Sequence, residues 1–129
     1  KRLERWQSWR DPWPINSIAS TAGTILMTDK DILQEWTNKI HQWLQKEVPW
    51  MQTKLENIAN IKAHTSSTNF QLIESKEPLT KLQDGLNKRN ILVRDCRSFS
   101  GLGENWLRIS LQTRRNNIRI VSAINAILK

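Results

Sequence analysis

The hydrophobic positions of this chain follow helical spacing at both ends and alternate in its middle. The N-terminal pattern predicts helices over 1–9 and 15–27. A longer helix follows, opened by a capping box of Thr28 and Asp31. Pro49 is expected to kink or split this helix, because proline removes a helical hydrogen bond. The apolar face of the long helix carries Ile32, Trp36, Ile40, Trp43, Leu44, Met51, Leu55 and Ile58.

The rest of the chain alternates short strands with helices. A short helix is predicted from Pro78, and a last helix capped by Thr113. Asn60 and Asn90 are each expected at a helix end with positive φ. The predicted fold class is α/β, as an α+β small domain with a small, mainly antiparallel sheet and helices packed on one face. The predicted strands are 61–63, 68–73, 91–93 and 106–111, and the core face of the last helix is Ile120, Val121, Ile124, Ile127 and Leu128.

Two arginines lie in strand segments where packing alone would not require them. Arg94 directly follows the apolar run 91–93, and Arg108 lies inside the alternating segment 106–111. Alternation places Leu107 and Ile109 on one face and Arg108 on the other. Two guanidinium groups on neighbouring strands form a good receiver for carboxylate or phosphate. The sequence therefore predicts a site for a small anionic ligand.

Composition narrows the possible partners. The 129 residues suit one domain or a piece of one, and no apolar run is long enough to span a membrane. The net charge of +8 favours anionic partners, but the charges are scattered and no nucleic-acid reading motif is present. We therefore expect no nucleic-acid and no membrane partner. A single cysteine, Cys96, indicates a reducing compartment, so we expect a cytoplasmic protein with an inert thiol there and no metal site.

The N-terminal segment and the tryptophans suggest a missing neighbour. The opening residues KRLERWQSWR look like the middle of a helix, so we expect the chain to be a piece of something longer. Seven tryptophans could form a stacking surface for sugars or bases, although packing in the core and between domains is favoured. If Trp6, Trp9 and Trp13 pack on a missing domain, the isolated chain exposes an apolar patch and self-associates.

The order of several motifs resembles the C-terminal small domain of fold-type I pyridoxal-phosphate enzymes, in the histidinol-phosphate aminotransferase branch. Within that branch, the Arg94-Asp95-Cys96 run is most similar to the threonine-phosphate decarboxylases of cobalamin synthesis, because the aminotransferases more often have proline after this arginine. The other segments that carry the resemblance are Pro12-Trp13 with Asn16, Ser67 with Asn69-Phe70, Phe99, Gly101-Leu102 and Leu107-Arg108-Ile109.

The resemblance implies a division of labour within a longer parent enzyme. Residues 1–13 would connect to a missing large domain, and 14–129 would form the small domain. Arg108 would bind the substrate carboxylate and Arg94 the phosphate-bearing end of a small amino-acid phosphate. Pyridoxal phosphate would be the parent's cofactor, and the parent would be a homodimer. The Schiff-base lysine belongs to the large domain, so this chain alone should have no catalytic or cofactor-binding residue and no activity.

One departure and two alternatives accompany this interpretation. The family's last helix often begins with Glu-Asn, whereas this chain has Asn116-Asn117 and lacks that favourable first-turn charge. A histidinol-phosphate-type aminotransferase is the nearest alternative function. An alternative of another class is a non-enzymatic basic binding module, which the net charge alone would also fit.

Overall fold

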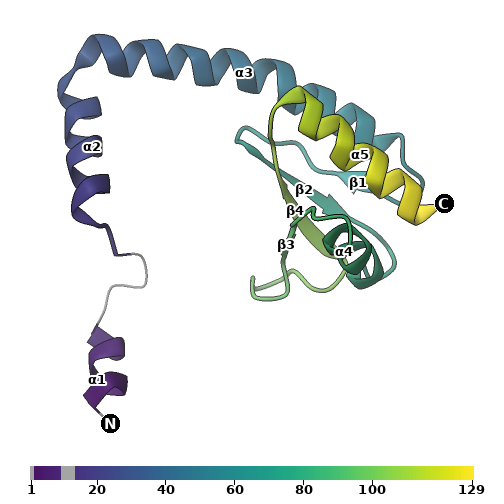
Figure 1. Cartoon of the computed structure of the whole chain (residues 1–129). Helices are drawn as coiled ribbons and strands as arrows, with labels where there is room; N and C mark the ends of the chain where they lie inside the picture. Colours follow the sequence, from purple (N-terminus) through teal and green to yellow (C-terminus); the bar gives the residue numbers. More distant parts are fainter. Residues whose placement is uncertain (1, 10–13) are drawn as a thin grey trace. The chain divides into compact units, whose positions relative to one another are not determined.

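Residues 2–9 and 14–129 are described by a computed structural model of the chain (Figure 1). The chain divides into two units, Lys1–Ile40 and His41–Lys129. The Pro12-Trp13 segment of the resemblance lies outside the described residues, and so does Trp13 as a predicted interdomain tryptophan. No helix among the described residues is long and apolar enough to cross a membrane.

The first unit is helical. It contains α1 (Arg2–Trp9), α2 (Ser17–Thr28) and the beginning of α3 (Lys30–Glu56). Asn16 caps α2, because its side-chain oxygen accepts a hydrogen bond of 2.8 Å from the amide of Ala19. The predicted capping box of α3 is wrong in its first residue. Asp29 performs that role at 3.0 Å from the amide of Ile32, while the hydroxyl of Thr28 donates back to a carbonyl of α2.

Helix α3 continues through Pro49 without interruption, so the helix is not split there. Proline in a helix interior costs about 3 kcal/mol. The residues that follow it compensate, because Met51 and Leu55 are both fully buried and each such side chain contributes roughly 1.5–3 kcal/mol. Burial on the core therefore holds the second half of α3 in place. The predicted positive φ of Asn60, just beyond the helix, is confirmed at 65°.

The second unit is built around a four-stranded sheet with the order β1-β2-β4-β3, in which every neighbouring pair is antiparallel. The predicted fold class is confirmed, as an α+β arrangement with a small antiparallel sheet. Hydrogen bonds between residues of α3 and α5 accompany the close course of these helices in Figure 1. The elements are β1 (Lys62–Ala63), β2 (Phe70–Glu74), α4 (Thr80–Asn87), β3 (Arg94–Asp95), β4 (Trp106–Ser110) and α5 (Arg114–Leu128).

One face of the sheet is covered and the other is not. In β2 and β4, every second residue is buried and the residues between are half-buried. Ile73, Leu107 and Ile109 form the covered face together with apolar residues of the helices. The main helical contributors to this core are Val48, Met51 and Leu55 of α3, Leu82 and Leu86 of α4, and Ile120, Ala123 and Ile124 of α5.

The predicted strand 91–93 is wrong, because ladder pairing begins only at Arg94. The amide of Ile91 donates to the carbonyl of Leu86 at 3.0 Å, and Asn90 has φ of 56°. These features close the end of α4 in a Schellman-type cap, so the amide of Ile91 is not free to join a sheet. Thr113 precedes α5 as predicted, but its side chain makes no capping hydrogen bond.

The predicted core faces of two helices extend further than the buried ones. Leu128, near the end of α5, is 40% exposed. In α3 the apolar positions before His41 are also exposed, with Trp36 at 54%. Periodicity indicates the apolar face of a helix, but it does not indicate how far along the helix that face is buried. The exposed positions of the predicted α3 face are Ile32, Trp36 and Ile40.

Candidate anion-binding site

The two arginines singled out by the sequence lie directly opposite each other on neighbouring strands. In the antiparallel pair of β3 and β4, Arg94 is the partner of Arg108, and Arg108 is in turn the partner of Leu72 on β2. Cross-strand partners point to the same face of a sheet. Both guanidinium groups therefore project from the face opposite the core.

Arg108 stacks on an aromatic ring and has no internal ionic partner. Its Cζ atom lies 4.3 Å from the centroid of the Phe70 ring and 6.0 Å from that of Phe99. The residue is half-buried. Within residues 14–129, its guanidinium group forms no hydrogen bond and no salt bridge to the protein. A guanidinium held through its flat face keeps its in-plane N–H donors available to an added anion.

Arg94 is more exposed and is tied to the loop that follows its strand. Its Nη2 atom donates to the hydroxyl oxygen of Ser98 at 3.1 Å, and its Cζ atom lies 5.8 Å from the centroid of Phe99. Asp95 closes the same turn by accepting the amide of Arg97 at 2.7 Å and by pairing with its guanidinium. The hydrogen bonds from Arg97 hold the pKa of Asp95 below its usual value. Arg97 is exposed, and its charge is matched locally by Asp95.

A pocket of about 340 Å³ lies beside Arg108. The side chains that line it include an imidazole, hydroxyl groups, aromatic rings and one guanidinium group. Cys96 also lines it and is buried, and burial raises the pKa of this thiol. The predicted inert thiol fits these surroundings. Among the residues that the structure describes, no cluster of three or more potential metal ligands is present. The lining residues with polar side chains are His64, Thr65, Ser66, Thr68, Cys96 and Arg108.

His64 occupies one wall of this pocket through a network at the sheet edge. Its Nε2 atom is 2.9 Å from a carboxylate oxygen of Glu74, and its ring packs at 4.8 Å from that of Trp106. Lys62 also approaches Glu74, at 3.3 Å. The hydrogen bond from His64 keeps the pKa of Glu74 low, with a further contribution from Lys62. The imidazole is therefore held by a carboxylate rather than directed at the arginines.

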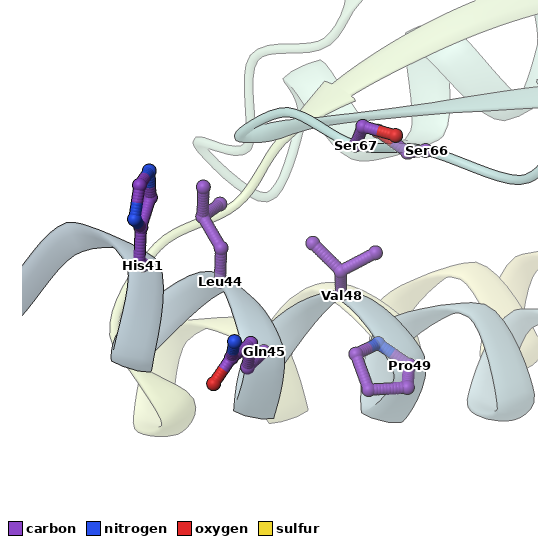
Figure 2. A pocket seen from close by; sticks show the side chains of 7 residues that line it. All are labelled: His41, Leu44, Gln45, Val48, Pro49, Ser66 and Ser67. Carbon is purple, nitrogen blue, oxygen red and sulfur yellow. The ribbon is translucent and has the colours of Figure 1, made fainter. Parts of the chain in front are cut away.

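A second pocket of about 320 Å³ lies between α3 and the loop that joins β1 to β2. Figure 2 shows the side chains of His41, Leu44 and Val48 on α3 projecting toward the loop with Ser66 and Ser67. Apart from His41, the residues that line this pocket have no ionisable acidic or basic side chain. Neither Arg94 nor Arg108 lines it, but it shares Ser66 with the pocket beside Arg108.

The aromatic partners of the arginines could not be assigned from the sequence. Phe70 belongs to the predicted strand 68–73, but its contact with Arg108 depends on the register of β2 and β4. Phe99 lies in the loop after β3, where the sequence gives no spacing to interpret. The available signal was indirect, because both phenylalanines belong to the motifs that carry the resemblance.

The fold and the paired arginines can be set beside known proteins. The chain is 31% identical, over 89% of its length, to an adenosylcobalamin biosynthesis bifunctional protein of Leptospira interrogans. It is 30% identical, over 88% of its length, to a histidinol-phosphate aminotransferase of Methanocella arvoryzae. The crystal structure of L-threonine-O-3-phosphate decarboxylase from Porphyromonas gingivalis matches 98% of the chain with a TM-score of 0.68 and 26% identity. No protein-family model matches the chain.

These matches cover only a part of each known protein. The chain spans 13% of the Leptospira protein, 29% of the aminotransferase and 38% of the decarboxylase chain. Fold and sequence thus make the chain similar to one part of certain decarboxylases and aminotransferases. The chain is a homologue of threonine-phosphate decarboxylases and histidinol-phosphate aminotransferases over about a third of their length, consistent with the predicted C-terminal domain.

Proposed function

We propose that the chain is the C-terminal, substrate-binding domain of a pyridoxal-phosphate-dependent threonine-phosphate decarboxylase that acts in cobalamin synthesis. Arg108 binds the carboxylate of the substrate, and Arg94 binds its phosphate-bearing end. The observation that carries this proposal is the pair of cross-strand arginines, one of which is stacked and has no ionic partner within residues 14–129. Similarity to the L-threonine-O-3-phosphate decarboxylase of Porphyromonas gingivalis supports the choice of substrate.

The physical argument for Arg108 rests on its free donors. Charge-assisted hydrogen bonds contribute roughly 1.5–3 kcal/mol each, and a guanidinium group can donate two of them to one carboxylate. Stacking on Phe70 restricts the side chain before the ligand arrives, so less conformational entropy is lost on binding. A carboxylate that leaves as carbon dioxide must not be over-stabilised in the ground state. A single cationic partner, Arg108, can bind the carboxylate without over-stabilising it in the ground state.

The residues that line the pocket beside Arg108 do not fit the cofactor itself. Pyridoxal phosphate needs a lysine amine for its aldehyde and an acidic partner for its ring nitrogen. The residues that line the pocket beside Arg108 include neither a lysine nor a carboxylate. We therefore assign the cofactor to the rest of the parent enzyme and derive no step through it. On this proposal the chain alone has no catalytic activity.

The proposed parent has a large domain and forms a homodimer in the cytoplasm. Residues 1–13 would connect the two domains, and residues 14–129 would form the small domain. Exposed apolar side chains in Lys1–Ile40, such as Ile18 at 83% and Met27 at 70%, support a covering partner for this segment. Closure of a neighbouring domain over the arginines would also exclude water from the site.

The proposal is tested on the full-length protein supplied with pyridoxal phosphate and O-phosphothreonine. Carbon dioxide released without a keto-acid acceptor is the expected result. Arg108→Ala should lower kcat/KM roughly ten-fold or more, because one charge-assisted pair is lost. Arg94→Ala should impair phosphorylated substrates most.

Arg115→Ala is the matched control, since Arg115 is exposed on α5 and forms no hydrogen bond or salt bridge within residues 14–129. Its kinetics should match those of the wild type. Unchanged kinetics in both Arg94→Ala and Arg108→Ala would contradict the assignment of the site. Amino transfer to a keto acid, with no carbon dioxide released, would instead favour the histidinol-phosphate-type aminotransferase, which the Methanocella homologue supports.

A further inference from the structure

We propose that Phe99 is a positioning residue that both arginines share, and that it sets the length of substrate the site accepts. This inference rests on the proposed function, because it assigns the two arginines to the two anionic ends of one ligand. Phe99 also lines the pocket beside Arg108, and in this scheme it acts by fixing the separation of the two guanidinium groups.

The geometry comes from one aromatic ring with two cationic neighbours. The Cζ atoms of Arg94 and Arg108 lie 5.8 Å and 6.0 Å from the centroid of Phe99. Both distances are within the range at which a guanidinium group is attracted to an aromatic face. Two like charges held close together repel each other, and an aromatic ring that attracts both partly offsets that repulsion. The ring therefore restrains a pair of groups that would otherwise move apart.

The position of Phe99 is itself fixed by the turn that follows β3. The amide of Phe99 donates to the carbonyl of Cys96 at 3.0 Å, and its carbonyl accepts the amide of Leu102 at 3.1 Å. Before it, the carboxylate of Asp95 binds the amide and the guanidinium of Arg97. The ring thus belongs to a turn that is held by hydrogen bonds on both sides, although the residue is 42% exposed.

Arg94 is attached to the same turn by a second contact. Its Nη2 atom donates to Ser98, the residue directly before Phe99. The opposite guanidinium group, that of Arg108, is anchored on the sheet by Phe70 at 4.3 Å. One receiver is therefore attached to the sheet and the other to the turn, and Phe99 contacts both. Removing its ring should loosen their separation without removing either charge.

The consequence is a preference for one separation between carboxylate and phosphate. O-phosphothreonine and O-phosphoserine have the same number of bonds between these groups, whereas O-phosphohomoserine has one methylene more. A restrained pair of arginines distinguishes the longer ligand from the shorter two, and a loosened pair accepts either. Phe99 thus influences selectivity for length, a property that general destabilisation of the fold would not change.

The test measures, by calorimetry, dissociation constants for O-phosphothreonine and O-phosphohomoserine of the full-length protein freed of pyridoxal phosphate, so that neither compound is consumed. In the wild type, O-phosphothreonine should bind more tightly. Phe99→Ala should reduce this preference about five-fold, because two aromatic contacts are lost. Phe99→Tyr keeps the ring and should retain the preference. Leu92→Ala is the matched control. Leu92 is 87% exposed, and the substitution removes an apolar side chain outside the site.

The outcomes separate this inference from the function on which it rests. Binding that Arg94→Ala and Arg108→Ala weaken, with an unchanged preference in Phe99→Ala, overturns the role of Phe99 alone. If the wild type binds neither compound, both proposals are overturned. Loss of preference in Phe99→Ala and its retention in Phe99→Tyr support the inference, even in a protein that proves to be an aminotransferase.

Discussion

Arg108 and Arg114 of the second unit both stack on aromatic rings, and their other partners give them different roles. Arg114 lies 4.4 Å from the centroid of the Trp50 ring and also binds both carboxylate oxygens of Glu47. Arg108 lies 4.3 Å from the centroid of Phe70 and has no ionic partner within residues 14–129. Arg114 therefore links α3 to α5, whereas the hydrogen-bond donors of Arg108 are available to a ligand. Residue type alone does not distinguish them.

The buried carboxylate of Glu47 should make stability depend on pH. Arg114 holds the pKa of Glu47 below its usual value, with help from Asn117 at 2.8 Å, and burial opposes this shift. A carboxyl group with a lowered pKa in the folded state stabilises the protein above its unfolded pKa of about 4.3. This contribution disappears as the pH falls through the folded pKa. Glu47→Gln should therefore cost about 2 kcal/mol of unfolding free energy at neutral pH.

Urea denaturation of wild type and variant at several pH values measures this difference. The gap between the two should narrow as the pH falls below about 4. Asp95 and Glu74 also have lowered pKa values, but they are unchanged in the variant and their effect cancels in the comparison. Glu77→Gln, an exposed position, serves as the control and should show no gap at any pH. A gap for Glu47→Gln that persists in acid would contradict the argument.

At the scale of elements, the sequence predicts best where one face of a segment is buried and the other is not. Alternation in 106–111 identified the strand β4 and the outward direction of Arg108, and burial of Leu107 and Ile109 agrees with it. The segment 91–93 is equally apolar, yet it is not a strand, because the end of α4 uses the amide of Ile91. This competition for one backbone donor is local hydrogen bonding at a helix end, which the periodicity of apolar residues does not indicate.

The same limit applies to the candidate site. The two arginines were identified from their unusual positions, but their direct pairing depends on the register of β3 and β4. The contacts of Phe99 depend on the turn between these strands, which no short-range pattern specifies. Sequence reasoning therefore predicted the charged groups of the candidate site and missed the aromatic residues that contact them.

The packing of α4 against α5 gives a prediction whose sign depends on one neighbour. An added Cβ atom at Gly85 would lie 3.0 Å from Cδ1 of Ile127. Alanine is favoured over glycine in a helix by about 1 kcal/mol, but overpacking against a branched side chain costs roughly 1–3 kcal/mol. Gly85→Ala should therefore lower the free energy of unfolding in the wild type. In an Ile127→Ala background, the same change should raise it.

Urea denaturation of the four proteins in this double-mutant cycle measures the reversal of sign. Gly23→Ala in α2 is the matched control, because an added Cβ atom there meets nothing within 4 Å. The helical circular dichroism of Gly23→Ala should equal or exceed that of the wild type, with no second substitution needed. Stabilisation by Gly85→Ala in both backgrounds would show that Ile127 moves aside at little cost.

At the scale of the whole molecule, the two units differ in how much apolar surface they bury. The buried hydrophobic cluster, from Val48 to Ile124, belongs entirely to His41–Lys129. In Lys1–Ile40, helix α2 has no buried residue, although it is the most apolar helix by composition. Such a segment contributes little to the fold of the second unit. Its composition is typical of a surface that another polypeptide covers.

We therefore expect the 129-residue chain to self-associate when it is separated from any larger parent. Trp6 and Trp9 are 67% and 72% exposed, and Ile18 and Met27 of α2 are more than two-thirds exposed as well. Burying such side chains between copies contributes roughly 1.5–3 kcal/mol for each one fully covered. Sedimentation velocity should show a mean mass that rises with protein concentration.

Replacement of the exposed α2 residues, as Ile18→Gln with Met27→Gln, should shift that rise to higher concentration because less apolar surface is gained on contact. Leu92→Gln is the matched control in the second unit, where Leu92 is exposed but stands outside the helical segment. Its self-association should equal that of the wild type. If the chain sediments as a monomer at every concentration, these apolar side chains are singly exposed to solvent and do not form an interaction surface.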